Sequence, residues 1–552
     1  MFFRTKKSGD RSYLQIVENR WEDGGPRQRV IATLGRLDEL QRTGALDSLL
    51  SSGAKFATHS LLISEYGKDQ SLAVAKKRIG IPLVFERLWE QTGCKAEIGV
   101  LVGKRKFEFD MERVAFMTVL HRLSGPGSDR SAELWRRDCR IEGVDELELH
   151  QVYRAMAWLG EELKEAQQDG GTKQLSRRCT KDLIEEGLFA RRRDLFTSLD
   201  LVFFDTTSIY FEGEGGQTLG QNGNSKDKRP DLKQMVVGAV LDDRGNPVCC
   251  EMWPGNTTDV KTLVPVASRL SNRFGIGQVC IVADRGMVSA KTIRELEVLG
   301  WKYILGARMR KQKEVCDKVL ARAGRFQVVR PKGTRSKDPS PLKVKEVWLD
   351  DRRYVVCLNE DQAKKDAADR EAILASLKEQ LRRGDKSLVG NKGYRKFIKT
   401  VGERFQIDPK KAELEVRFDG KWVLRTNTQF DAAQVALKYK QLWVVEDIFR
   451  AMKSLLETRP IYHRNDETIR GHVFCSFLAL VLRKELQDRL ETKGLDVEWA
   501  DVIRDLDQLQ EIEMKKDGKR FLIRTESKGC CGKVFQTVGV AMPPTVRQVR
   551  DS

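Results

Sequence analysis

Three polar residues on one predicted helix have side chains that could act on a phosphodiester. Tyr439, Glu446 and Lys453 follow one another at intervals of seven residues. At roughly 100° per helical residue, this spacing places the three side chains within an arc of about 40°. A carboxylate can hold a metal ion, whereas a cation and a phenol can contact phosphate oxygens. The spacing therefore predicts a helix face suited to phosphodiester chemistry, if other carboxylates join it.

Two further carboxylates follow short apolar runs that are typical of buried strands. Asp205 comes directly after residues 201–204, and Asp284 comes directly after residues 278–283. Two adjacent strands of a rigid sheet could bring both carboxylates to one point. Taken singly, an Asp after a strand is more often a turn or cap residue, and Glu446 is more often an exposed helix residue. The joint pattern is more specific, because it predicts three carboxylates at one site.

A pocket with only oxygen ligands suits Mg²⁺, for which Mn²⁺ can substitute. Two such ions, about 3.5–4 Å apart, can activate a nucleophile and stabilise the leaving oxygen of an in-line displacement. We therefore expect two divalent ions to be held by Asp205, Asp284 and Glu446.

The composition favours a polyanion as partner. The chain has 552 residues, with 99 Lys and Arg against 80 Asp and Glu, and a formal net charge of +19. Nucleic acid is the first candidate for a large protein with this balance, although a basic protein without such a partner is the alternative. A hydrophobic content of 40% favours folded structure, and the length predicts several domains.

The cysteines and histidines argue against zinc sites and disulfides. The eleven Cys are scattered, no C-x-x-C occurs, and the five His form no H-E-x-x-H motif. We therefore expect buried, reduced cysteines, and structural hydrogen bonds for His463 and His472. The start of the chain lacks the apolar run of a signal peptide, and the longest apolar run, residues 473–482, is about half a membrane span. These features predict a cytoplasmic protein without membrane contact.

The order of predicted elements indicates an α/β fold. Between residues 200 and 308, three strand-like runs are followed by a helix, a strand, a helix and a strand. A meander followed by α/β units is the order of a ribonuclease-H-like mixed sheet. The predicted segments are 1–60, a small β unit; 61–199, a mainly helical region whose dense Arg and Lys indicate DNA binding or a solvated face; 200–308, the first part of the catalytic domain; 309–425, a β-rich insertion with strand-like runs that include 413–418; 426–490, the helical completion that carries Glu446; and 491–552, a C-terminal tail.

The order Asp205, Asp284, Glu446, with a β-rich insertion before the Glu, resembles the DDE transposases of bacterial insertion sequences. The chain is more closely similar to the subgroup with a Tyr-x2-Arg-x3-Glu-x6-Lys signature. The signature positions here are Tyr439, Leu442, Glu446 and Lys453. The other similar stretches are 225–234, 254–259, 283–286 and 419–427, so that the resemblance covers roughly residues 200–485.

The resemblance implies a function and partners. The protein would be a DNA transposase that binds the terminal inverted repeats of its element, cleaves DNA to a 3′-hydroxyl and joins that hydroxyl to target DNA. Its partners would be double-stranded DNA, as transposon end and as target, and further copies of the chain in a homo-oligomer, expected to be a dimer on DNA. Residues 61–199 would bind the DNA end. The protein would lie in the bacterial cytoplasm, with the nucleoid when bound to DNA.

The resemblance also implies roles for single residues. Asp205, Asp284 and Glu446 would bind the metal ions, and Tyr439 and Lys453 would contact phosphates of the transposon end.

One position departs from the signature, since Leu442 stands where it has Arg and a phosphate contact is thereby lost. Arg450 lies one turn beyond Glu446 and either replaces that contact or pairs with Glu446. Trp443 either stacks on a displaced base or lies in the core. Arg285 either contacts phosphate or belongs to an ordinary turn.

Other functions remain open at this point. A ribonuclease-H-like DNA nuclease would stop at hydrolysis, and an inactive relic would bind DNA without turnover. An aspartyl-phosphate phosphatase ranks below both, because it needs a second Asp where this chain has Thr207.

Overall fold

The computed structural model describes most of the chain and divides it into two compact units. The described residues are 1–22, 25–54, 74–168, 176–193, 201–276, 279–330, 341–383, 394, 396–401, 404–516 and 519–549. The smaller unit comprises Met1–Arg78, Gln508–Lys528 and Met542–Ser552, and the larger unit comprises Ile79–Asp507 and Gly529–Ala541. None of the helices in these described ranges is long and apolar enough to cross a membrane.

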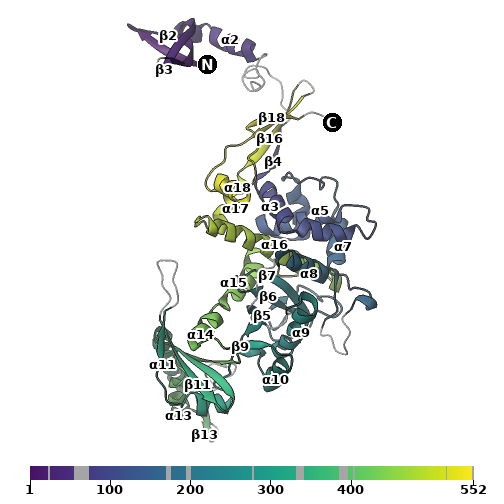
Figure 1. Cartoon of the computed structure of the whole chain (residues 1–552), viewed down its shortest axis with the longest axis vertical. Coiled ribbons are helices and arrows are strands. Elements are labelled where there is room, and N and C mark those ends of the chain that lie inside the picture. The colour runs from purple at the N-terminus through teal and green to yellow at the C-terminus, as the bar shows by residue number, and fades with distance from the viewer. Residues whose placement is uncertain are drawn as a thin grey trace. The chain divides into compact units, whose positions relative to one another are not determined.

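The larger unit is built around a mixed sheet of nine strands. Three strands form an antiparallel meander, and a fourth runs parallel both to the first of these and to a fifth strand. These five are β5 (Leu201–Tyr210), β6 (Gln234–Asp242), β7 (Pro247–Pro254), β8 (Cys280–Ala283) and β9 (Lys302–Gly306). Figure 1 labels β5, β6, β7 and β9 of this sheet. The helices α9 (Leu263–Phe274) and α10 (Ala290–Val298) connect β7 to β8 and β8 to β9. The predicted α/β order with a mixed sheet is therefore confirmed.

Helices cover both faces of this sheet, and the alternation of side chains along β5 explains why. Val202 and Phe204 pack with α9 and α10, while Leu201 and Phe203 pack with α14 (Ala432–Lys440) and α15 (Trp443–Arg450). Successive strand residues point to opposite faces, so one continuous apolar run fills two cores. Figure 1 shows α14 and α15 on one side of β5 and β6, and α9 and α10 on the other.

Four strands that come after β9 in the chain continue the same sheet. The last of them, β15 (Lys421–Thr426), pairs antiparallel with β9. The others are β12 (Arg352–Asn359), β11 (Leu342–Leu349) and β10 (Gln327–Val329), which follow β15 in this order toward the sheet edge. Between β12 and β15 lie the helix α11 (Glu360–Arg383) and a hairpin of β13 (Ile398–Val401) and β14 (Arg404–Ile407).

The expectation of a strand at residues 413–418 is wrong. These residues belong mostly to a helix, α13 (Pro409–Val416). The Asp408 side chain caps its N-terminus by accepting the Lys410 backbone N–H, and Pro409 occupies its first turn. Both features favour a helix start, and they outweigh the alternating pattern that follows.

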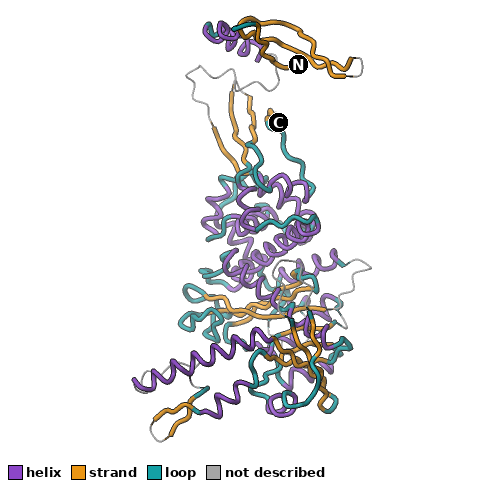
Figure 2. Tube along the Cα trace, turned by 90° about the vertical axis from the view of Figure 1, so that its left-hand side faces the viewer, coloured by secondary structure: helices purple, strands orange, loops and turns teal. Residues whose placement is uncertain are grey.

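A mainly helical region precedes the sheet and packs on the long helix α16 (Asp466–Thr492), which buries residues 473–482. Figure 2 shows helices of the larger unit in purple and its strands in orange. The helices of this region are α3 (Gly80–Gln91), α4 (Cys94–Val102), α5 (Met111–Ser124), α6 (Asp129–Arg136), α7 (Leu149–Leu159) and α8 (Thr180–Arg192). Several of the arginines that suggested DNA binding are engaged within it, since Arg178 pairs with Glu186 and Arg191 with Glu97. Two further helices of the larger unit are α17 (Trp499–Asp507) and α18 (Cys531–Val538).

The smaller unit contains two antiparallel sheets. One consists of β1 (Phe2–Ser8), β2 (Arg11–Glu22) and β3 (Gly25–Arg36), followed by α1 (Leu37–Arg42) and α2 (Ala45–Ala54). Residues 22–26 have a sequence typical of a turn, and two of them, Asp23 and Gly24, lie outside the described residues. The other sheet consists of β4 (Val74–Arg78), β16 (Gln510–Lys516), β17 (Lys519–Arg524) and β18 (Val546–Val549). β16 of the C-terminal segment thus pairs with β4, a strand from the first eighty residues.

Candidate active site

Asp205 and Asp284 occupy corresponding positions at two neighbouring strands of the nine-stranded sheet. The parallel strands β5 and β8 pair Phe204 with Ala283, so the two aspartates are the next residues along each strand. Asp284 follows the end of β8, as expected. The expectation that β5 ends at Asp205 is wrong, because this strand continues to Tyr210 and pairs with β6 over its added length.

Both aspartates belong to the sheet face that α14 and α15 cover. Asp205 alternates with Leu201 and Phe203, and Asp284 with Cys280 and Val282, all of which pack under these two helices. Residues on a following helix can therefore reach the aspartates without crossing the sheet.

Tyr439, on α14, contacts one of these two aspartates. Its hydroxyl donates a hydrogen bond of 3.0 Å to Oδ1 of Asp284. Burial raises the pKa of Tyr439, and the Asp284 carboxylate raises it further, so the phenol stays protonated and can donate. Gly306 permits the approach, since a Cβ there would lie 2.6 Å from the Tyr439 hydroxyl oxygen.

A third aspartate, which the sequence reasoning missed as a site residue, lies beside the other two. Oδ1 of Asp259 accepts a hydrogen bond of 2.8 Å from the Thr206 hydroxyl, and its Oδ2 lies 3.3 Å from Nζ of Lys226. Lys226 also donates to the Thr206 backbone oxygen at 2.6 Å. Thr258 and Asp259 precede a predicted helix, which favours a helix cap as their role. No side chain caps the short 3-10 helix Asp259–Lys261 that forms there. The sequence did contain a signal for Asp259 and Lys226, because they lie in the stretches 254–259 and 225–234 that are similar to DDE transposases.

Asp205 is a weaker acid than usual, mainly because it is buried and to a smaller extent because other carboxylates lie near it. Burial raises the pKa of Asp205 to about 6, and the charges of Asp284 and Asp259 act in the same direction. Lys226 and the Thr206 backbone N–H oppose this rise. A divalent cation would relieve the same crowding, and the nearby donors are carboxylate oxygens. The residues present therefore fit Mg²⁺ or Mn²⁺.

The predicted continuous face of Tyr439, Glu446 and Lys453 is wrong. The chain forms α14, then a tight turn at Gln441 and Leu442, then α15, and continues as a π-helix over Ala451–Leu455. An α-helical period of 3.6 residues does not extend across these changes. Glu446 is exposed on α15 and makes no hydrogen bond or ion pair with any residue that the structure describes.

Lys453 is held by a carboxylate within the protein. Its Nζ lies 2.8 Å from Oδ1 of Asp227, which Arg459 also contacts at 2.6 Å. The Asp227 side chain is only 7% exposed. The Lys and Arg around Asp227 in the sequence favour a solvated charge cluster, and the burial of its side chain shows that this expectation is wrong.

Leu442, which stands where the signature has Arg, is buried, whereas Trp443 and Arg450 are exposed. Leu442 is 7% exposed and packs in the apolar cluster between the sheet and α14–α15. Trp443 is 60% exposed, so the core alternative for this side chain is wrong. Arg450 is exposed and pairs with Asp447 at 3.3 Å, not with Glu446.

A basic cavity of about 370 Å³ opens next to Asp284. Arg285 is exposed at its rim, and Arg308 is fixed there by donating to the backbone oxygens of Arg285, at 3.0 Å, and Gly286, at 2.8 Å. The full lining is Asp284, Arg285, Gly286, Arg308, Met309, Arg310 and Lys311. Cations so close to a carboxylate cluster could hold the phosphates that flank a scissile bond.

Comparison with protein families decides the identity. Residues 197–482, more than half of the chain, match the family model of the transposase DDE domain. The chain belongs to the DDE transposase family. Residues 3–64 match the N-terminal domain of the IS1634 family transposase, so this is an insertion-sequence transposase. A DDE transposase is a metal-dependent enzyme that cleaves DNA and transfers its strands, which confirms the predicted activity.

Solved transposase structures are similar to this DDE transposase only in part. A piggyBac transposase synaptic complex with hairpin DNA matches at 12% identity over 78% of this chain and 78% of that chain, with a TM-score of 0.36. A Mos1 transposase paired-end complex with the left transposon end matches at 13% identity over 44% of this chain and 70% of that chain, with a TM-score of 0.15. No curated protein matches at a significant level. Because both TM-scores are low, these structures carry no information about the roles of single residues in this chain.

Proposed function

We propose that this DDE transposase binds the terminal inverted repeats of its element, cleaves DNA to a 3′-hydroxyl and joins that hydroxyl to target DNA at a site formed by Asp205, Asp284 and Glu446. One observation carries this proposal. The two aspartates follow paired residues of the neighbouring strands β5 and β8, on the sheet face that α14 and α15 cover. Two ions, Mg²⁺ or Mn²⁺, would supply activation of the attacking oxygen and stabilisation of the leaving oxygen when bound.

We choose Glu446 as the third carboxylate because its helix, α15, packs on the strand that carries Asp205. α15 packs against β5 and β6, and its residues Val445 and Phe449 are buried in the cluster under that helix. Glu446 follows Val445 directly and is free to turn toward the sheet, since no described residue holds its carboxylate. Tyr439 orients Asp284 through its hydrogen bond, and Lys226 balances the charge of Asp259.

The proposed DNA contacts are exposed cations and one exposed ring. Arg285 and Arg308 line the basic cavity beside Asp284, where they would hold phosphates of the cut strand. Arg450 and Trp443 project from α15, where they would contact phosphate and stack on an unpaired base. Tyr439 and Lys453 would reach phosphate only after exchanging their present partners, Asp284 and Asp227. Membership of the DDE transposase family supports DNA as the partner.

The test is cleavage of end DNA in the presence of Mg²⁺ or Mn²⁺. Asp205→Asn, Asp284→Asn and Glu446→Gln should each lower cleavage at least a hundredfold, because each removes a charged ligand. Asp447→Asn is the matched control for Glu446, since it changes the neighbouring carboxylate of the same helix and should cleave as the parent does. Cleavage by Glu446→Gln at the parent rate would refute the assignment of Glu446.

The same reaction separates transposition from simple hydrolysis. A product that joins the end DNA to a second duplex would show strand transfer. Cleaved ends without such a product would identify a nuclease. DNA that is bound but not cut would identify an inactive relic. We further propose a dimer on DNA, one protomer for each transposon end. The mass of the complex in light scattering tests this, and one protomer on a pair of ends would contradict it.

A further inference from the structure

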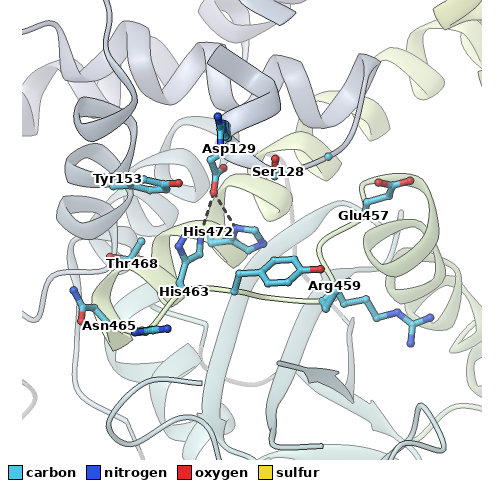
Figure 3. Close-up of a pocket in the computed structure, with 14 residues that line it drawn as sticks. Ser128, Asp129, Tyr153, Glu457, Arg459, His463, Asn465, Thr468 and His472 are labelled. Atoms are coloured by element: carbon cyan, nitrogen blue, oxygen red, sulfur yellow. Dashed lines mark hydrogen bonds and ion pairs between the residues drawn. The ribbon is translucent and has the colours of Figure 1, made fainter. Parts of the chain in front are cut away.

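A second cluster of possible metal ligands lies away from the three aspartates. It joins Asp129, the first residue of α6, to His472 on α16 and to His463 in the segment before α16. Figure 3 shows the Asp129 carboxylate directed at both imidazole rings, at the edge of a cavity of about 770 Å³. The sequence predicted only structural hydrogen bonds for the two histidines, because Asp129 is far from them in the chain.

We propose that Asp129, His463 and His472 form a second metal site, which takes a transition metal ion such as Zn²⁺ rather than Mg²⁺. Nε2 of His463 lies 3.0 Å from Oδ2 of Asp129 and 3.2 Å from Nδ1 of His472, and the third side of this triangle is 3.8 Å. Ligands about 2.0–2.1 Å from a tetrahedral ion are roughly 3.3–3.4 Å apart. The three observed separations, 3.0–3.8 Å, lie on either side of this value, so small shifts of the side chains would suit one such ion.

The hydrogen bonds around His472 set its ring for ligation. Nε2 of His472 lies 3.1 Å from the Thr458 backbone oxygen, which can only accept, so Nε2 carries the proton. Nδ1 then presents its lone pair toward His463 and Asp129. Metal-bound histidines in proteins generally donate their other N–H to a carbonyl or carboxylate in this way.

Arg122 marks what must change when an ion binds. Its Nη2 lies 2.8 Å from Nδ1 of His472 and 3.6 Å from Oδ1 of Asp129, so a guanidinium now donates to the lone pair that the ion would take. Nε and Nη1 of Arg122 have no hydrogen-bond partner among the described residues, although the side chain is buried. Ion binding therefore requires two changes: Arg122 must release Nδ1 of His472, and the His463 ring must give up the Nε2 proton that it now directs at Oδ2 of Asp129. Oδ1 of Asp129 is the oxygen left for Arg122.

The donor set decides the chemical class of the ion. Two imidazole nitrogens and one carboxylate oxygen favour zinc-type ions, whereas Mg²⁺ prefers oxygen ligands alone. The adjoining cavity is large enough for a water molecule as the fourth ligand. Ser128, Tyr153 and Asn465 line this cavity with polar groups that can hydrogen-bond to such a water. The ion would tie α6 to α16 and so connect the helical region to the helix that packs on β7.

The experiment measures metal uptake by the full chain after removal of metals with a chelator. In equilibrium dialysis the parent should bind one more Zn²⁺ per chain than His463→Gln and Asp129→Asn. His150→Gln is the matched control, because His150 is an exposed histidine on α7 and its loss should not change uptake. Circular dichroism without metal checks that each variant is folded. A hundredfold excess of Mg²⁺ should not displace the zinc.

Co²⁺ and thermal melting give two further readouts that do not depend on DNA cleavage. With Co²⁺ bound, the parent should show d–d absorption bands that are missing in His463→Gln. These bands should come without a thiolate charge-transfer band, and its absence distinguishes this site from a metal ion bound by the free cysteines. Zinc should raise the melting temperature of the parent by a few degrees and leave that of His463→Gln unchanged. Equal zinc uptake by the parent and His463→Gln, or displacement by Mg²⁺, would overturn the proposal.

Discussion

Leu442 gives the sharpest test of the structure, because the resemblance and the fold predict opposite effects for Leu442→Arg. This substitution restores the residue of the signature. If the position faced DNA, the new guanidinium would add a phosphate contact and strengthen binding. The structure instead places Leu442 in the apolar cluster that also contains Val435, Val445 and Phe449.

The size of the effect follows from this burial. The Leu442 side chain is 7% exposed, and removing such a leucine from its apolar site costs about 2 kcal/mol in transfer free energy. A guanidinium in the same cluster adds a desolvation cost of several kcal/mol, part of which the long side chain avoids by reaching toward solvent. We therefore expect Leu442→Arg to lower the free energy of unfolding by about 4 kcal/mol or more. Leu442→Ala, which only leaves a cavity, should cost about 2–4 kcal/mol.

Urea unfolding followed by circular dichroism measures this loss as a lower midpoint. Trp443→Arg is the matched control, since it places the same new charge one residue away on a side chain that is 60% exposed, and its midpoint should stay near that of the parent. An unchanged midpoint for Leu442→Arg, together with tighter binding of end DNA, would show that Leu442 faces the DNA and that the described packing is wrong.

Three further predictions concern charges. Asp227→Asn leaves the cations of Lys453 and Arg459 side by side at a largely buried position, so urea unfolding should show a loss of about 2–3 kcal/mol. Burial lowers the pKa of His121 to about 4, so between its ordinary value near 6.5 and pH 4 the folded protein binds fewer protons than the unfolded chain. Stability from His121, roughly 3 kcal/mol at most, should thus be full above pH 6.5 and decline toward pH 4, and unfolding curves of His121→Gln should show a smaller decline. Arg450→Ala should leave the unfolding midpoint unchanged but weaken DNA binding, and lower the slope of log affinity against log salt by about one in a salt titration. An unchanged salt slope would remove Arg450 from the DNA interface.

Much of the catalytic sheet could be predicted from the sequence, because its signals are local. The apolar runs of β5 to β9 and the periodicity of α9 and α10 are contained in short segments, and their order in the chain already indicates the mixed sheet. The two aspartates could be found in the same way, since each directly follows an apolar run. The strand predicted at residues 413–418 was wrong because a cap at Asp408 determines a helix there.

The sequence by itself therefore determined the order of the elements, the two strand aspartates and the family to which the chain belongs. Only the tertiary structure decided which side chains share a site, because burial and pairing depend on residues distant in the chain. It buried Leu442, engaged Lys453 with Asp227 and brought Asp129 to His463 and His472. A helical period assumes one regular helix, and the turn before α15 and the π-helix after it changed that geometry.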